Sequence, residues 1–238
     1  MKKSLRVNEI KKYENQYEDK IFITFDIDWA SDIVLEYTLD IIEEHDVSCT
    51  FFVTHETPLL KRLRKNPKIE LGIHPNFNFL LSGDFRYGKT FDEVIDYYFN
   101  IVPDAVSCRC HSLVQSSNIL EGLSNKGIKF DLNLYLPPEV TAHPFLHFNK
   151  KILRLPHFWE DDIHALSGMK WNPMEFLNKP GLKVFDFHPI HVFLNMEILD
   201  RYIKAKKYNN DYTKLKSFVN QTETGTKFFL ENLIKNIT

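Results

Sequence analysis

Residues 21–28 read Ile-Phe-Ile-Thr-Phe-Asp-Ile-Asp, and this stretch decides the fold class. Its first five residues are apolar or β-branched, which predicts a buried β-strand. Two carboxylates follow at once, at Asp26 and Asp28, where the predicted strand ends. Residues 32–45 then repeat apolar side chains at helical spacing. A buried strand followed by an amphipathic helix is the repeating unit of α/β folds with a parallel sheet.

The same alternation continues along the chain. Further strands are expected at 49–53, 69–73, 105–108, 128–132 and 182–187. Further helices are expected at 57–65, 91–101, 116–126 and 227–235, with Thr90 and Glu93 as a capping box before the second of them. We therefore expect an α/β fold with a parallel sheet or barrel in a single domain. Residues 1–18 are expected to form a polar arm, and residues 19–238 the domain with a helical C-terminal tail.

Composition narrows the classes of protein further. The 30 basic and 32 acidic residues give a formal charge of −2, so the chain lacks the basic footprint of a nucleic-acid-binding protein. No apolar run approaches the roughly 20 residues that span a bilayer, so no membrane span is expected. The polar N-terminus lacks the apolar segment of an export signal, and three cysteines cannot form a disulfide framework. These features favour a cytoplasmic protein.

Polar residues stand where the predicted strands end. They are Asp26, Asp28, His74, Arg109 and His188. Each has an ordinary explanation on its own, as a helix cap, a hydrogen-bonded strand-end histidine or an ion-pair arginine. None of these ordinary explanations accounts for the fact that all five residues follow predicted strands. Because the carboxyl ends of parallel strands open on one face, the sequence predicts that they meet in one site, with the composition of a metal-assisted hydrolase.

Several ordered motifs around these residues resemble the polysaccharide deacetylase superfamily, which contains the NodB-homology carbohydrate esterases. The closest resemblance is to its WbmS-like branch, which is associated with surface-polysaccharide or O-antigen loci. The five motifs are found at residues 24–28, 71–78, 109–112, 159–162 and 185–191. The resemblance covers about residues 20–200 and implies an irregular (β/α) barrel with seven strands, in agreement with the alternation of strands and helices.

For catalysis, the resemblance implies a base, an acid and a supporting cation. Asp26 would be the general base that takes a proton from the attacking water. Arg109 would hold Asp26 ionised and oriented, and it is the only part of the family's third motif that this chain keeps. His188 would be the general acid that protonates the departing amine.

For the cofactor, the resemblance implies one divalent metal ion. Asp28, His74 and Asn78 would be its ligands, with Asn78 standing where the family has a second histidine. Zinc is the first expectation. Because an amide oxygen suits harder ions, manganese, cobalt or magnesium is also compatible with this set.

Around the substrate, the resemblance implies contacts from the third and fourth motifs. The backbone N–H of Ser112 would stabilise the oxyanion, and His111 beside it would contact the substrate. Trp159 would line the groove, and either Asp161 or Asp162 would orient the arginine of the third motif. The partner would be a small-molecule or oligosaccharide substrate, while the oligomeric state is left open.

The function implied is a metal-dependent hydrolase that removes an N-acyl group, first of all N-acetyl, from a sugar in surface-polysaccharide biosynthesis. Two alternatives are kept. One is a catalytically degenerate member of the same fold that only binds carbohydrate. The other is a haloacid-dehalogenase-type phosphatase, because residues 25–28 also resemble the first motif of that family. That alternative leaves the strand-end histidines without a role.

Overall fold

The computed structural model describes residues 2–11 and 17–237. Its ten described strands form one sheet in the order β7-β8-β6-β5-β4-β3-β2-β10-β9, with β1 paired to β2 outside this path. All pairings are parallel except that of β7 with β8. The strands are β1 Lys3–Leu5, β2 Lys20–Asp26, β3 Cys49–Val53, β4 Ile69–Ile73, β5 Ser107–Cys108, β6 Phe130–Asp131, β7 Phe145–Leu146, β8 Leu153–Arg154, β9 Trp159–Glu160 and β10 Lys183–Phe187.

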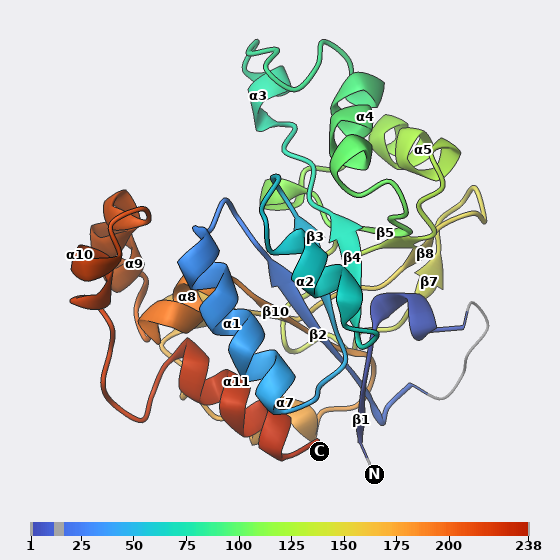
Figure 1. Cartoon of the computed structure of the whole chain (residues 1–238). Helices are drawn as coiled ribbons and strands as arrows, with labels where there is room; N and C mark the ends of the chain where they lie inside the picture. The colour runs from blue at the N-terminus through green and yellow to red at the C-terminus, as the bar shows by residue number, and fades with distance from the viewer. Residues whose placement is uncertain (1, 12–16, 238) are drawn as a thin grey trace.

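Helices cover the outside of the curled sheet (Figure 1). The α-helices are α1 Asp32–Glu44, α2 Leu60–Lys65, α3 Asn78–Leu81, α4 Phe91–Ile101, α5 Ser117–Asn125, α6 Asp161–Ser167, α7 Met174–Leu177, α8 Pro189–Leu194, α9 Leu199–Ala205, α10 Tyr212–Lys216 and α11 Thr226–Lys235. Three 3-10 turns complete the set, η1 Val7–Glu9, η2 His111–Leu113 and η3 Lys206–Tyr208. Helix α8 packs between α1 and α11, so helices from the start and from the end of the chain lie in one layer.

The expected α/β fold is confirmed, and the sheet is a curled half-barrel. Strands β2 and β3 are buried almost throughout, as their continuous apolar sequences indicate for a sheet covered on both faces. Half of the predicted capping box is present, since Thr90 Oγ1 accepts a hydrogen bond from the backbone N–H of Glu93 at 3.2 Å. The Glu93 side chain accepts instead from the backbone N–H of Lys89, one residue before the cap, at 2.7 Å.

The N-terminal arm is attached to the sheet more closely than its polar sequence suggests. Strand β1 extends the sheet beside β2, and Val7 is fully buried. The backbone N–H of Val7 donates to Thr50 Oγ1 at 3.0 Å, and that of Asn8 donates to Glu70 Oε2 at 2.8 Å. Part of the predicted arm, residues 12–16, lies outside the described residues.

The C-terminal tail is helical, as predicted, and packs around a second, smaller core. This core contains Ala30, Val34, Ile190, Phe193, Leu194, Met196, Ala205 and Leu215. It fixes α10 against the beginning of α1, on the side where β2 ends. No helix in the described residues has the length and apolar character needed to cross a membrane.

Candidate active site

The polar residues at the strand ends meet in one site, as the sequence predicts. Asp26 is the last residue of β2, and Asp28 follows it by two positions. His74, Arg109 and His188 directly follow β4, β5 and β10. Because these strands are parallel to one another, their carboxyl ends lie at the same edge of the sheet.

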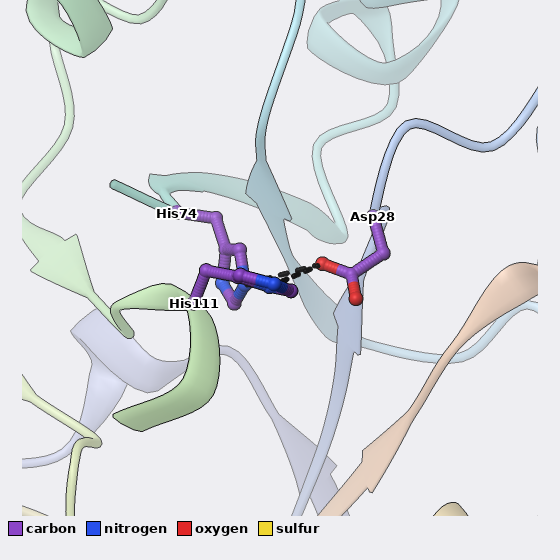
Figure 2. A group of neighbouring side chains, drawn as sticks. All are labelled: Asp28, His74 and His111. Atoms are coloured by element: carbon purple, nitrogen blue, oxygen red, sulfur yellow. Dashed lines mark hydrogen bonds and ion pairs between the residues drawn. The ribbon is translucent and has the colours of Figure 1, made fainter. Parts of the chain in front are cut away.

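Three donor atoms from three different loops face one another beside this edge (Figure 2). His74 Nε2 and His111 Nδ1 each lie 3.2 Å from Asp28 Oδ1. The two imidazole nitrogens are 3.4 Å apart. Asp28, His74 and His111 therefore form a compact triangle of one carboxylate oxygen and two nitrogens, which we call the donor triangle.

The donor triangle fits a divalent metal ion. Ligands at 2.0–2.1 Å from a tetrahedral ion are themselves about 3.3–3.4 Å apart, which matches the separations of these three donors. Two imidazoles and one carboxylate are a donor set that suits zinc or cobalt, and three protein ligands leave a position open for substrate or water. His74 Nδ1, on the other side of the ring, faces Asp26 Oδ1 at 3.3 Å and is thereby oriented.

Asn78 is not part of the donor triangle. Its side chain is exposed, and its Nδ2 donates to Ser112 Oγ at 3.1 Å. The local turn explains this position: Asn76 Oδ1 accepts from the backbone N–H of Asn78 at 2.9 Å and starts α3, which carries the side chain outward. The backbone N–H of His111 donates to the carbonyl of Pro75 at 2.9 Å, and this bond brings the His111 ring to the third donor position.

The predicted base, Asp26, is held by a buried arginine. Arg109 is fully buried, and its Nε donates to both Asp26 oxygens at 3.0 and 2.9 Å. Its other nitrogens reach Thr24 Oγ1 at 3.0 Å and Asp186 Oδ1. Burial alone would raise the pKa of Asp26, but the Arg109 guanidinium and the His74 ring outweigh it and hold that pKa well below its usual range.

The residue that orients Arg109 is Asp186, so the prediction that Asp161 or Asp162 does so is corrected. Asp161 instead accepts two hydrogen bonds at Oδ1, from His188 Nδ1 and His191 Nδ1, each at 2.8 Å. Its Oδ2 accepts from the backbone N–H of His188 at 2.8 Å.

The surroundings of His188, the predicted acid, favour its protonated form. Burial works against its charged form, but the Asp161 carboxylate, together with Asp28, raises the pKa of His188 well above its ordinary value. The free nitrogen Nε2 of His188 lies 3.7 Å from Asp28 Oδ2, so it points toward the donor triangle. A protonated imidazole thus stands beside the place where a substrate held by the triangle would react.

Within the fourth motif, Asp161 belongs to the site and Trp159 belongs to the core. Trp159 is only 2% exposed and stacks on Phe229 with ring centroids 4.2 Å apart, so it stabilises the core behind β9. Asp162 is the second residue of α6, and its Oδ1 accepts a hydrogen bond from the backbone N–H of Ile163 at 2.6 Å. Burial and the neighbouring Glu160 carboxylate raise the pKa of Asp162 to about 7.

The loop after β2 is held in an unusual backbone conformation. Asp28 and Trp29 both have positive φ angles, 37° and 54°, which residues with a side chain rarely adopt. The backbone N–H of Trp29 donates to Thr54 Oγ1 at 3.1 Å, and its carbonyl accepts from Asn209 Nδ2 at 2.9 Å. Such strain persists where surrounding contacts enforce it, and here it aims the Asp28 carboxylate at the two histidines.

The curled parallel sheet and the acid, base and donor residues at its carboxyl edge define the class of protein as a polysaccharide deacetylase-like α/β fold. A family model of WbmS-like polysaccharide deacetylases matches residues 23–206, and the chain belongs to this family. Among curated proteins, the sequence has no match.

Solved structures agree with this assignment. The chain is similar to a Bordetella bronchiseptica protein described as a polysaccharide deacetylase involved in O-antigen biosynthesis, with a TM-score of 0.91 and 38% identity over 99% of this chain and 98% of that chain. It also shares its fold with a polysaccharide deacetylase from Mycobacterium smegmatis, with a TM-score of 0.51 and 14% identity over 96% of this chain and 92% of that chain.

Two residues of the site were not singled out from the sequence. Asp186 lies inside the apolar run of β10, where a charged residue without an obvious partner is a signal for a buried ion pair. His191 lies one helical turn after His188, and this spacing places both rings on the side of α8 that faces Asp161.

Proposed function

We propose that this protein is a metal-dependent hydrolase that removes an N-acetyl group from a sugar during surface-polysaccharide biosynthesis. The observation that carries the proposal is the donor triangle of Asp28, His74 and His111, with the Asp26–Arg109 pair on one side and the Asp161–His188 pair on the other. Membership of the WbmS-like family supports the reaction, and the similarity to the Bordetella bronchiseptica protein supports the biosynthetic setting.

The chain's own residues divide the work of amide hydrolysis. A divalent ion held by the donor triangle would polarise the amide carbonyl and lower the pKa of a water molecule. Asp26, kept ionised by Arg109, accepts the proton of the attacking water. His188, kept protonated by Asp161, gives a proton to the departing amine.

The oxyanion that forms during attack needs a donor of its own. The backbone N–H of Ser112 is the proposed donor, because Ser112 directly follows His111 in η2. Ser112 has a φ of 55°, and its Oγ accepts from Asn78, so the loop that carries this N–H is held in place. Asn78 thus has a supporting role in this proposal, while His111 is the third ligand.

The proposal is tested by acetate release from N-acetylated sugars after chelation and after addition of zinc, cobalt or manganese. We expect activity to disappear on chelation and to return with zinc or cobalt. Asp26→Asn should abolish acetate release, by at least about 100-fold for loss of a general base, while the ion still binds. Asp104→Asn, an exposed aspartate in a turn, is the matched control and should keep full activity.

The outcomes separate this function from the alternative of a carbohydrate-binding protein without turnover. Sugar binding with no acetate release in the metal-loaded protein, and no effect of Asp26→Asn, would favour that alternative. Acetate release that survives complete chelation would contradict the metal-dependent reaction while leaving the family assignment intact.

A further inference from the structure

A cavity of about 500 Å³ lies between the start of α1 and the C-terminal segment around α10, and its lining includes Trp29, the residue that follows Asp28. Its lining residues are Trp29, Ala30, Ser31, Asp32, Ile33, His55, Asn209, Asn210, Tyr212 and Leu215. This volume is within the range of small-molecule sites, about 300–1,000 Å³. The lining combines aromatic rings with amides, a hydroxyl and a carboxylate.

Trp29 connects this cavity with the proposed reaction centre. It directly follows Asp28, and its ring meets the ring of His111 edge-on with centroids 5.1 Å apart. The half-buried Trp29 therefore contacts a donor residue and also contributes to the lining of the cavity. A molecule that reacts at the donor triangle and extends past Trp29 would enter the cavity.

Hydrogen bonds within the protein hold the wall of this cavity in place. Asn209 Nδ2 donates to the carbonyl of Trp29 at 2.9 Å, and the backbone N–H of Ser31 donates to Asn209 Oδ1 at 3.4 Å. These two bonds tie the C-terminal segment to the loop after β2 across 180 positions of sequence. Leu215, fully buried in the second core, fixes α10 beneath Tyr212. A wall held in this way lowers the ordering cost of binding.

The charge of the lining argues against an anionic occupant. Among the described residues that line the cavity, none is Lys or Arg, and Asp32 contributes a negative charge. One Asp32 oxygen accepts from Thr57 Oγ1 at 2.5 Å. Burial lowers the pKa of His55, so its ring is neutral at pH 7. The lining itself offers a diphosphate no cation, and Lys216, whose Nζ lies 5.8 Å from the centroid of the Tyr212 ring, stands outside the lining. The hydroxyl groups of a sugar would find amide, carboxylate and imidazole partners in the lining.

We propose that this cavity binds an uncharged sugar unit that adjoins the N-acylated sugar, so that the substrate is an oligosaccharide and not a nucleotide-activated monosaccharide. Tyr212 supplies an exposed aromatic face for that unit, and Asn210 supplies an exposed amide. This inference rests on the proposed deacetylase function for the position of the reacting sugar. It assigns the C-terminal segment a part in substrate selection.

The test compares three kinds of probe on the zinc-loaded protein carrying Asp26→Asn, which binds without turnover. The probes are N-acetylglucosamine, its β-1,4-linked dimer to tetramer together with a panel of other N-acetylated disaccharides, and UDP-N-acetylglucosamine. Isothermal titration calorimetry measures each affinity. We expect at least one oligosaccharide to bind about tenfold more tightly than the monosaccharide, and we expect no such gain from the UDP group.

Tyr212→Ala should remove the gain in affinity from the added sugar and leave monosaccharide binding unchanged. Tyr97→Ala is the matched control, because Tyr97 is similarly exposed, 37% against 42% for Tyr212, and lies on α4 outside the cavity. Equal affinity for all chain lengths, no oligosaccharide binding, preference for the UDP-linked sugar, or a gain that survives Tyr212→Ala would each overturn the proposal.

Acetate release from the same probes by the wild-type protein separates this inference from the proposed function. Oligosaccharide binding that depends on Tyr212, with no acetate released, would support the cavity and contradict the deacetylase. Acetate release from UDP-N-acetylglucosamine with no advantage for any oligosaccharide would support the deacetylase and contradict the cavity.

Discussion

Replacing Arg109 by methionine should damage the protein in two linked ways. The guanidinium is fully buried, and it faces Asp26 and Asp186, which are 4% and 1% exposed. Methionine fills similar space but offers no donor, so two buried carboxylates lose their common cation. Breaking a buried ion pair by removing one partner costs about 3–5 kcal/mol. For a chain of this size that loss lowers Tm by about 6–20 °C.

The loss should depend on pH in a defined direction. Burial already raises the pKa of Asp186 when Arg109 is present, and without Arg109 it raises the folded-state pKa of both carboxyls above that of the unfolded chain. The folded state then binds more protons than the unfolded state, so the stability of Arg109→Met falls as pH rises. Urea unfolding followed by circular dichroism at pH 5 and pH 8 measures this, and the loss should be larger at pH 8.

A second substitution measures how much of the lost stability comes from the interaction between Arg109 and Asp186. In the Asp186→Asn background one of the two carboxylates is already gone, so Arg109→Met should cost less there, with a coupling of about 0.5–3 kcal/mol. Acetate release at pH 7 should also fall by at least about 100-fold, because the Asp26 pKa rises and the base becomes protonated. If Arg109→Met stays within about 1 kcal/mol of wild type at pH 8, or loses the same stability in both backgrounds, Arg109 does not hold the two carboxylates as described.

Three further outcomes are expected. Burial lowers the pKa of His164 to about 4, so the free energy of unfolding should fall by up to about 3 kcal/mol as pH drops from 6.5 to 4. His164→Phe should remove this part of the pH dependence, measured by urea unfolding. Gly72→Ala should cost about 1–3 kcal/mol in the same assay, because a Cβ there would lie 2.6 Å from the Phe52 ring; no measurable loss would contradict this. Asp161→Asn should lower the pKa of His188 and move the alkaline limb of the activity profile to lower pH, and an unchanged limb would show that Asp161 does not set it.

The strand-end residues could be predicted from the sequence because their positions depend on local patterns. An apolar run marks each strand, and parallel pairing brings the ends of β2, β4, β5 and β10 to one edge. The motif resemblance then assigned Asp26, Arg109 and His188 to roles that their contacts support. No distance had to be known for these assignments.

The rest of the site depends on contacts between distant segments. His111 belongs to the donor triangle because its N–H bonds to the Pro75 carbonyl, a contact between separate loops. Asp186 meets Arg109 because β10 pairs with β2 in a register that sets Asp186 opposite Thr24. Sequence periodicity carries no information about either contact, so the third donor and the partner of Arg109 came only from the structure.

The metal site is tested most directly by anomalous diffraction from crystals soaked in zinc, recorded at the zinc edge. We expect one zinc ion per chain, ligated by Asp28, His74 and His111, with Asn78 still bonded to Ser112. An ion ligated by Asn78 in place of His111, or no ion at the donor triangle in a soaked crystal, would contradict this expectation.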